Sequence, residues 1–497
     1  FGEAQKPRQP YTGYSKWLEN ENMSDLQKKN KEAEAVFRRT GITFNVYGDS
    51  EQEERLIPFD IVPRILSGNE WRRLQQGLEQ RVRSINAFIH DVYHKQEIFK
   101  AGWLPISLIN KNPVFVPEMI GFTPPGGVYT HIVGVDLVRT HENEFYVLED
   151  NVRTPSGVSY MLENRETMLE IFPELFSISK VKSVTEYPLK LLNSLIESAP
   201  GKQKDPVVSV LTPGVYNSAY FEHSFLADQM GVELIESHDV RIIDGHIAMR
   251  TTQGYQRIDI LYRRIDDQYI DPLTFNSDSL LGIPGLMDIY KAGSLTLANA
   301  PGSGVADDKA IYSFMPEIIR FYMGEEPLLK NVQTWRCAEK DHLKYVLENL
   351  DSLASDIRVS GIALGGADLS AELGSDMGWD SLLYSRSRII SYASINGVFS
   401  IDSPFMQIDD LEGLEEESKK AKSIGFTSKF AIHPNQIEII RRNFLPTNQE
   451  IEEAKEIIKA FANSDRGAIA VNGKMVDEPV VKLMKKKLML AGFNPDN

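Results

Sequence analysis

Three oxygen-bearing side chains lie close together in the segment HIVGVDLVRTHENEFYVLEDNVRTPSG (131–157). Asp136 lies in an apolar run that ends in a polar turn at 140–144. Glu149 and Asn151 lie two residues apart at the end of the next apolar run. Because side chains alternate along a strand, a hairpin would place all three on one face. Such oxygens bind Mg²⁺, so the pattern predicts a magnesium site, with a merely solvated acidic hairpin as the simpler alternative.

The elements around this hairpin indicate mixed α and β structure. Residues 1–35 are polar and helix-prone, and Gly41 would end this N-terminal helix. Residues 70–96 have apolar side chains near helical spacing. From 205 onward a strand, a helix and further strands follow in VVSVLTPG, AYFEHSFLADQMG, VELIE and RIDILYRR, the order of a layered α/β unit. We expect a boundary near 195–205, at ESAPGKQKDP.

A different order of strands and helices begins near residue 357. Strand-plus-helix units repeat through RVSGIAL, SLLYSRSRIISYASIN, GVFSI, DLEGLEEESKKAKSIG, KFAI and NQIEIIRRNF, as a parallel sheet requires. A long amphipathic helix is expected at 448–463, followed by a hairpin at AIAVNGKMV and a last basic helix. The Asn472–Gly473 pair suits a type I′ turn in that hairpin.

The composition limits the classes of partner. The chain has 497 residues, 42% of them hydrophobic, which is enough for two to four domains. Its net charge of −16 disfavours binding to nucleic acid or to an anionic membrane surface. Cys337 is the only cysteine, and no apolar run of about 18 residues occurs. We therefore expect a cytoplasmic protein that binds small molecules, neither nucleic acid nor membrane.

The hairpin and its surroundings resemble a known family. An Asp in an apolar strand, a short hairpin, YVLEDN, and then Arg, Pro and Gly resemble the metal-binding end of the ATP-grasp ligases. In most members this element follows the ATP-binding lobe, whereas here it precedes the α/β unit, an order that resembles the circularly permuted ATP-grasp type 2 family. The likeness covers residues 10–350, through segments such as RRTGITFNVYG, PGGVYTHIVGVDLVR, LTPGVYNSAYFEHSFLADQMGVELIE, YRRIDDQYIDPL and LANAPGSGVADDKAIYSFMPEIIRFY.

This resemblance implies a ligase that forms an amide-type bond. ATP would phosphorylate a substrate carboxylate, and an amine or peptide would displace the phosphate. The resemblance gives Asp136, Glu149 and Asn151 the role of holding Mg²⁺. Arg153 and the loop 154–157 are candidates for holding the carboxylate or the transferred phosphoryl group, although Arg153 could instead pair with a nearby acid.

ATP binding needs further groups. Tyr216 and Asn217, in TPGVYNSAY, follow a strand and open a helix, where backbone N–H groups favour an anion; a simple turn is the alternative. Family members carry an ATP-contacting lysine and a glycine-rich loop after a YVL segment, but KYVLENLDSLASDIRVSG contains neither. We therefore expect the ATP lobe to be missing, with Lys309, in SGVADDKAIYSF, remaining as a peripheral ATP contact.

A second resemblance begins beyond residue 355. Asp368, in GIALGGADLSAELG, follows a buried strand, at the catalytic end if the units form a barrel; such an Asp alone is more often a helix cap. The segments LLYSRSRIISYASINGVFSID, DDLEGLEEESKKAKSIGFTSKFAIHPNQIEIIRRNF and AVNGKMVDEPVV resemble the C-terminal half of the citrate lyase β-subunit and malyl-CoA lyase (HpcH/HpaI aldolase) family. These enzymes are Mg²⁺-dependent barrels that cleave or form carbon–carbon bonds of acyl-CoA esters.

That resemblance implies a second set of site residues. Asp368 would be a metal ligand, and Asp477 an acid/base residue delivered to a neighbouring subunit's site. The loops 401–405 and 431–436 would lie along a CoA ester, unless His433 belongs to a simple strand-to-helix turn. An eight-unit barrel needs about 250 residues, and only three strand–helix units are recognisable here. The open sheet edges of a partial barrel would favour a homo-oligomer through this module.

The expected fold is α/β and α+β and multidomain, a truncated permuted ATP-grasp fold followed by a partial (β/α) barrel. Residues 1–200 would carry the metal-binding hairpin, 201–350 a small α/β domain, and 351–497 the lyase-like barrel with a C-terminal arm. Three functions stay open. They are an ATP- and Mg²⁺-dependent carboxylate–amine ligase impaired by loss of the ATP lobe, an Mg²⁺-dependent acyl-CoA lyase, and an inactive hybrid joined near residue 350.

Overall fold

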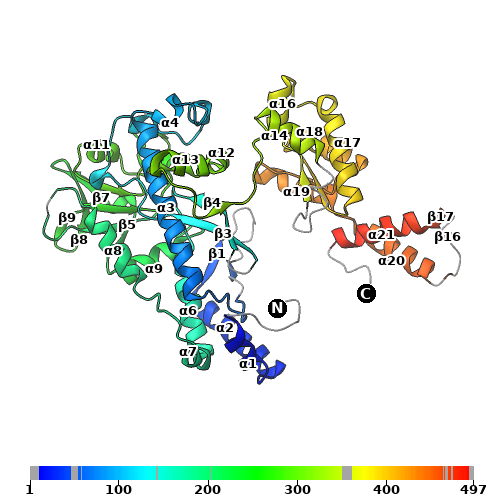
Figure 1. Cartoon of the computed structure of the whole chain (residues 1–497), viewed down its shortest axis with the longest axis horizontal. Helices are drawn as coiled ribbons and strands as arrows, with labels where there is room; N and C mark the ends of the chain where they lie inside the picture. Colours follow the sequence, from blue (N-terminus) through cyan, green and yellow to red (C-terminus); the bar gives the residue numbers. More distant parts are fainter. Residues whose placement is uncertain are drawn as a thin grey trace. The chain divides into compact units, whose positions relative to one another are not determined.

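A computed structural model of the chain forms two compact units, Phe1–Thr334 and Trp335–Asn497 (Figure 1). It describes residues 10–45, 54–56, 59–141, 144–201, 203–349, 361–462, 464, 468–471 and 474–491. Both units mix helices with strands, which confirms the multidomain α and β fold. The finer division at 1–200, 201–350 and 351–497 stays a prediction.

The first unit alternates helices with short strands. Its α-helices are α1 (Thr12–Leu18), α2 (Met23–Thr40), α3 (Gly68–Tyr93), α4 (Glu97–Lys100), α5 (Ser107–Asn110), α6 (Val158–Ile171), α7 (Pro173–Ile178), α8 (Tyr187–Glu197), α9 (Tyr220–Met230), α10 (Asp267–Ile270), α11 (Leu286–Lys291), α12 (Lys309–Ser313) and α13 (Met315–Met323). Its strands are β1 (Thr43–Asn45), β2 (Glu54–Leu56), β3 (Gly134–His141), β4 (Glu144–Asn151), β5 (Val208–Leu211), β6 (Glu233–Ile235), β7 (Val240–Ile243), β8 (His246–Thr251), β9 (Gly254–Arg257), β10 (Ile260–Arg263), β11 (Thr296–Ala298) and β12 (Lys330–Asn331).

The expected N-terminal helix is α2. The Asn22 side chain caps its start by accepting a hydrogen bond from the backbone N–H of Asp25. Gly41 ends it in the left-handed conformation, with φ of 75°, which a residue without a Cβ adopts at little cost. The apolar face of α2, including Phe37, packs in a cluster that also contains Trp17 and Phe172. The predicted helix and its glycine end are both confirmed.

A four-stranded parallel sheet with the order β11-β10-β5-β6 forms the centre of the α/β part. Alternate side chains of its strands enter two different cores, as the pleat requires. Val210 and Tyr262 belong to the cluster beneath α8 and α9, whereas Leu211 and Leu261 belong to the larger core. This strand, helix and strand order confirms the layered unit predicted from residue 205.

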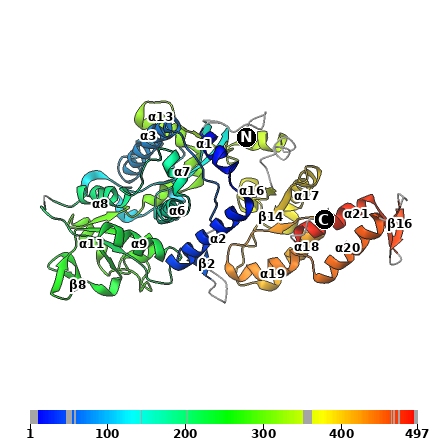
Figure 2. The same cartoon turned by 90° about the horizontal axis from the view of Figure 1, so that it is seen from below.

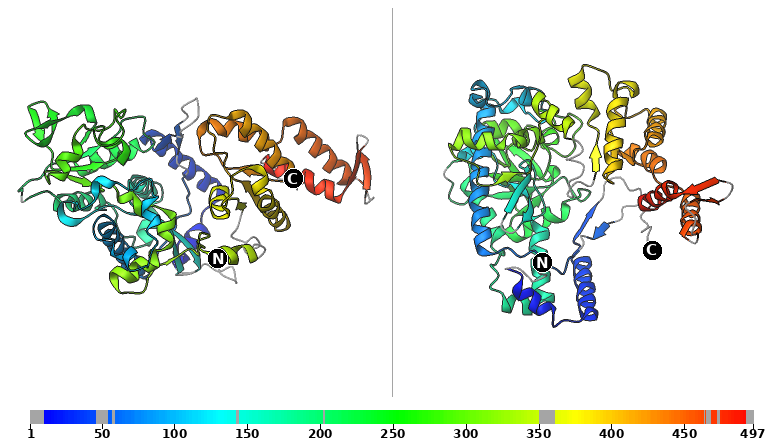
Figure 3. Two further views of the ribbon diagram at one scale, coloured as in Figure 1. Left: turned by 90° about the horizontal axis from the view of Figure 1, so that it is seen from above. Right: turned by 45° about the vertical axis from the view of Figure 1, so that its right-hand side comes forward.

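The hairpin of β3 and β4 lies in a second sheet, with the order β12-β4-β3. One face of this sheet packs on α3, the long blue helix in the right-hand view of Figure 3. Val147 and Leu74 are buried together there, with 0% and 2% of their surfaces exposed. The hairpin therefore packs against the helix predicted at 70–96.

The second unit contains the repeated strand–helix pattern. Its helices are α14 (Lys340–Glu348), α16 (Gly366–Leu373), α17 (Trp379–Ile395), α18 (Leu411–Ile424), α19 (Pro434–Phe444), α20 (Asn448–Ala462) and α21 (Glu478–Leu490). Its strands are β13 (Gly361–Ala363), β14 (Phe399–Asp402), β15 (Ser428–Lys429), β16 (Ala468–Val471) and β17 (Lys474–Asp477). β13, β14 and β15 form a parallel sheet in chain order, which agrees with a partial barrel.

The C-terminal arm consists of α20, α21 and the hairpin of β16 and β17. The strands are antiparallel and contact the two helices, and Figure 2 shows β16 beside α21. The predicted hairpin is present, but its turn residues Asn472 and Gly473 lie outside the described residues, as does residue 350, near which the junction is expected. Among the described residues, no helix is both long and apolar enough to cross a membrane.

Candidate functional site

The predicted metal ligands converge on the face of the hairpin that points away from α3. Asp136 pairs directly with Glu149 across the ladder. The ladder is irregular between Asp136 and Leu137, because Leu137 pairs with Val147 and leaves Leu148 without an opposite residue. This bulge shifts the alternation, so Val147 faces α3 while Glu149 and Asn151 face outward.

Lys309 joins these side chains from the first position of α12. Its ammonium forms an ion pair with Glu149 Oε2 and donates a hydrogen bond to the carbonyl of Leu148 at 3.2 Å. The side chain of Lys309 is 60% exposed, so the pair lies at the surface. The sequence predicted Lys309 only as a peripheral contact, whereas the structure places it on a predicted metal ligand.

The two carboxyl groups have opposite pKa shifts. Partial desolvation and the charge of Glu149 raise the pKa of Asp136 above its ordinary value. The hydrogen bond and charge of Lys309 lower the pKa of Glu149. Asp136 is therefore the carboxyl group that takes up a proton first as the pH falls. An added cation would lower the pKa of Asp136, because it would offset the repulsion between the two carboxylates.

The opposite face of β4 is anchored by a buried ion pair. Asp150 lies between Glu149 and Asn151 in sequence, so its side chain points toward α3. There Arg81 donates from Nε and Nη2 to the two oxygens of Asp150 at 2.6 and 2.7 Å. Arg81 also donates from Nη1 to Asn331 of β12 at 2.9 Å. This bidentate pair fixes the end of β4 and hence the direction of its outward side chains.

Arg153 lies between two acids. Its Nε is 3.5 Å from Asp266 Oδ1 and 3.8 Å from Asp307 Oδ2, and the side chain is 37% exposed. The alternative in which Arg153 pairs with nearby acids is therefore present in the structure. Its exposed part remains open to an anionic substrate. Burial raises the pKa of Asp307 to about 6, against the lowering effects of the Val152 backbone and of Arg153.

The loop after Arg153 is held by a carboxylate from α9. Glu222 is fully buried and accepts hydrogen bonds from the backbone N–H groups of Gly157 and Ser159 at 2.7 and 3.0 Å. Its other oxygen lies 3.4 Å from Arg264 Nη2, and Arg264 Nη1 donates to the carbonyl of Pro155 at 2.7 Å. An internal anion thus already occupies the start of α6, so these N–H groups are not available to a substrate.

Tyr216 and Asn217 lie in the loop between β5 and α9. The helix α9 begins at Tyr220, so Tyr216 and Asn217 lie before it. The Asn217 side chain accepts a hydrogen bond from the backbone N–H of Ala219 at 2.9 Å, which forms a turn before the helix. Tyr216 is 80% exposed. Both residues can reach solvent, and their role in binding an anion stays a prediction.

The predicted lyase residues lie at helix starts in the second unit. Asp368 is in the first turn of α16, and its side chain lies outside the described part of the chain. His433 caps α19, with its Nδ1 accepting from the N–H of Asn435 at 3.4 Å. Asp477 caps α21 by accepting from the N–H of Val480 at 3.2 Å. For His433 and Asp477 the capping contacts supply a structural role, and their catalytic roles stay predictions.

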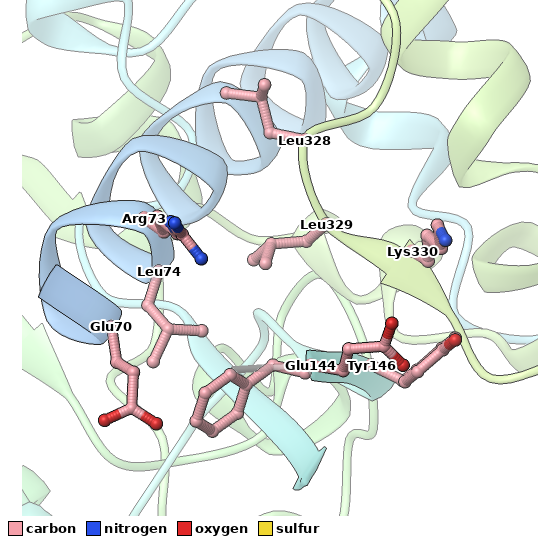
Figure 4. A pocket seen from close by; sticks show the side chains of 9 residues that line it. Glu70, Arg73, Leu74, Glu144, Tyr146, Leu328, Leu329 and Lys330 are labelled. Atoms are coloured by element: carbon pink, nitrogen blue, oxygen red, sulfur yellow. The ribbon is translucent and has the colours of Figure 1, made fainter. Parts of the chain in front are cut away.

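A hydrophobic and charged cavity lies at the other end of β4 (Figure 4). Its volume is about 170 Å³, and its walls are Glu70, Arg73, Leu74, Glu144, Phe145, Tyr146, Leu328, Leu329 and Lys330. Glu144 and Tyr146 are at the beginning of the strand, whereas the predicted ligands are at its end. This cavity is therefore not part of the site.

The donor set of the hairpin suits a hard cation. Two carboxylates and an amide offer oxygen ligands on an open surface, where water can complete the coordination of Mg²⁺. Within the described ranges, no group of three or more His, Cys, Asp or Glu side chains is arranged to hold a metal ion. The hairpin differs because its third donor is Asn151. Its chemistry fits Mg²⁺ and not the softer metals that favour histidine or thiolate.

The chain belongs to the circularly permuted ATP-grasp family, whose model matches residues 63–373. A second model, of the HpcH/HpaI aldolase and citrate lyase family, matches residues 344–434. Both expected resemblances are confirmed. The two matches overlap over residues 344–373.

Relatives of the first family are similar over most of the chain. An uncharacterised protein of Synechocystis is 48% identical over 348 residues, which is 70% of this chain and 72% of that protein. A Mycobacterium bovis protein is 45% identical over 70% of this chain but only 62% of its own length. A Frankia alni protein provisionally named glutamate–cysteine ligase 2-3 is 38% identical over 70% of this chain and 40% of its own length.

A solved structure is similar to a smaller part of the chain. It is the protein CitE of Mycobacterium tuberculosis, in complex with magnesium, acetoacetate and coenzyme A. The match is 32% identical, covers 29% of this chain and 56% of CitE, and has a TM-score of 0.25.

Sequence reasoning missed the residues that organise the site from a distance. Asp266 and Arg264 occur in YRRIDDQYIDPL, and Asp307 in VADDK, both of which looked only like family segments. Glu222 occurs in a helix with no local sign of its partners. The one available signal was the cluster of charges in otherwise apolar segments, since a buried charge needs a partner. Spacing alone could not identify those partners.

Proposed function

We propose that the first unit supplies the metal-binding half of an ATP- and Mg²⁺-dependent carboxylate–amine ligase. The observation that carries this proposal is the convergence of Asp136 and Glu149 as paired residues on the outward face of the hairpin. Asn151 supplies the third oxygen donor. The family match and the name of the Frankia relative support the ligase class and an amino acid or peptide as substrate.

Each side chain has a defined part in this proposal. Asp136, Glu149 and Asn151 would hold Mg²⁺, which supplies positive charge for the phosphates of ATP. Arg153 would orient the substrate carboxylate. Its side chain is partly exposed, and Arg153 follows Asn151 by two residues in the chain. The carboxylate would take the γ-phosphoryl group, and the amine would then replace phosphate to form the amide. Lys309, Tyr216 and Asn217 would contribute peripheral ATP contacts.

The rate of this reaction is expected to be low. The strand and glycine-rich loop that grip ATP in the family are not recognisable after residue 350, where the lyase-like segment follows. We therefore propose weak turnover or partial reactions for the chain as it is.

The direct test is formation of ADP from ATP by the full chain with amino acid and peptide mixtures. We expect Mg²⁺-dependent ADP formation that Glu149→Gln abolishes. Glu186→Gln is a matched control, because Glu186 is a surface residue that pairs with Lys190 of α8. The ligase proposal is wrong if Mg²⁺-ATP gives no thermal shift and no mixture yields ADP.

A second candidate function belongs to the second unit. We propose an Mg²⁺-dependent acyl-CoA lyase remnant, favoured by the family match at 344–434 and the parallel sheet of β13, β14 and β15. Asp368 would bind the metal, Asp477 would act as acid/base, and His433 would lie near the CoA ester. Retention of the full chain on immobilised CoA, with release by free CoA, tests this; passage without retention would remove its support.

The third candidate is an inactive hybrid of the two families. The two family matches overlap over residues 344–373, which favours a junction within that range, near residue 350. Long-read sequencing of genomic DNA across codons 345–360 distinguishes a real gene fusion from an assembly product. A continuous reading frame would indicate a real fusion, whereas two separate genes would indicate an assembly product.

A further inference from the structure

We propose that Lys309 is a built-in counter-ion of the metal site, which a divalent cation must displace from Glu149. In the metal-free protein its ammonium neutralises Glu149. When a divalent cation binds, the ammonium leaves that carboxylate and remains tethered beside it. This inference rests on the proposed function, since it takes the hairpin as the metal site.

The backbone around Lys309 is fixed to β4. Lys309 opens α12, whose start is capped by Asp308 through the N–H of Ala310 at 2.7 Å. Tyr312 of the same helix donates from its hydroxyl to the carbonyl of Val147 at 2.6 Å. The ammonium lies 5.4 Å from the centre of the Tyr312 ring. The base of the lysine is thus held next to the hairpin, whatever its ammonium contacts.

The Lys309 side chain lies largely in solvent. Because this side chain is 60% exposed, the ammonium can leave Glu149 without breaking a buried contact. Its hydrogen bond to the Leu148 carbonyl, at 3.2 Å, can be replaced by water. Exposed ion pairs contribute little to stability. A divalent ion brings twice the charge to the same carboxylates, so the exchange is favourable.

The charges around the hairpin also call for an added cation. Asp136 and Glu149 face each other across the ladder as two carboxyl groups, and Lys309 supplies one positive charge through its pair with Glu149. Lys309 therefore competes with a metal ion and lowers the affinity of the site, but it does not substitute for the metal ion.

The test is Mn²⁺ binding to the full chain, followed by the EPR signal of free Mn²⁺. Lys309→Met removes the competing charge, and we expect it to bind Mn²⁺ about 3- to 30-fold tighter than the wild type. Lys309→Arg keeps the charge and should bind within about twofold of the wild type. Lys190→Met is the matched control, because it removes a surface lysine that pairs with Glu186 at 3.3 Å and should leave affinity unchanged.

Equal or weaker Mn²⁺ binding by Lys309→Met would overturn the inference, and so would the same tightening in Lys190→Met. Glu149→Gln separates this failure from failure of the metal site. If Glu149→Gln loses Mn²⁺ but Lys309→Met does not tighten it, only the role of Lys309 is wrong. If Glu149→Gln binds Mn²⁺ as the wild type does, the hairpin is not the metal site. Because Lys309 is exposed, circular dichroism should confirm that Lys309→Met and Lys309→Arg fold.

Discussion

Asp307 links the acid–base behaviour of the site to the stability of the first unit. Its Oδ1 accepts a hydrogen bond from the backbone N–H of Val152, and its Oδ2 lies 3.8 Å from Arg153 Nε. Burial nevertheless raises its pKa from 3.8 to about 6. The folded protein therefore holds a proton on Asp307 in a pH range where the unfolded chain has lost it.

The first prediction concerns the pH dependence that this proton causes. Between about pH 4 and pH 6 the folded state binds more protons, so the contribution of Asp307 to stability falls as the pH rises. Asp307→Asn cannot titrate but can still accept from Val152. Relative to this variant, the wild type should lose about 1–3 kcal/mol between about pH 4 and pH 7. Urea unfolding of the first unit measures this, and a pH-independent difference between the two proteins would contradict it.

The start of α6 shows how one buried side chain can organise an element. Glu222 accepts from Gly157 and Ser159, and it lies beside the buried guanidinium of Arg264. Arg264 in turn holds the Pro155 carbonyl. The loop that follows Arg153 is thus held by Glu222 of α9 and by Arg264, which follows β10.

The second prediction follows from this contact. Glu222→Ala should leave Arg264 buried without its carboxylate, at a cost of about 3–5 kcal/mol. Hydrogen exchange followed by mass spectrometry should show faster exchange in the peptide that contains Gly157 and Ser159. Glu222→Gln keeps one oxygen acceptor and should accelerate exchange less. Equal protection in the wild type and Glu222→Ala would show that the carboxylate does not hold the loop.

At the scale of elements, much could be predicted from sequence. Alternation of side chains placed Asp136, Glu149 and Asn151 on one face, and helical spacing predicted α3. The bulge at Leu148 could not be predicted, since it depends on pairing with the opposite strand. The partners of Glu222 and Asp307 are distant in sequence, and no local pattern encodes such contacts. For the loop before α9 the sequence left a helix start and a simple turn open, and Asn217 forms the turn by accepting from the N–H of Ala219.

The whole molecule consists of two units with separate stabilising networks. In the second unit, Asp402 and Lys429 end neighbouring strands, and their side chains are 2.8 Å apart. Arg386 Nε donates to Asp402 Oδ1 at 2.8 Å, and Glu417 lies 2.6 Å from Lys429 Nζ. Arg386, Asp402 and Lys429 are buried, so this network has no solvent to replace a lost partner.

The third prediction tests the independence of the units. Asp402→Asn should leave the buried network with excess positive charge and destabilise the second unit by about 3–5 kcal/mol. Hydrogen exchange should then increase in 361–444 and stay unchanged in 134–151. Asp376→Asn is a control in the same unit, because Asp376 is exposed and should cost under about 1 kcal/mol. Equal acceleration in both units would show that they unfold together.

The most direct test of the central claim is divalent cation binding by the hairpin, with Mn²⁺ in place of Mg²⁺. We predict that the full chain binds Mn²⁺ and that Asp136→Asn and Glu149→Gln each weaken binding at least about tenfold. Because the pKa of Asp136 is raised, acidification should begin to weaken Mn²⁺ binding at a higher pH than it would for an ordinary aspartate ligand. Unchanged affinity in both variants, or no binding by the wild type at millimolar Mn²⁺, would contradict the claim.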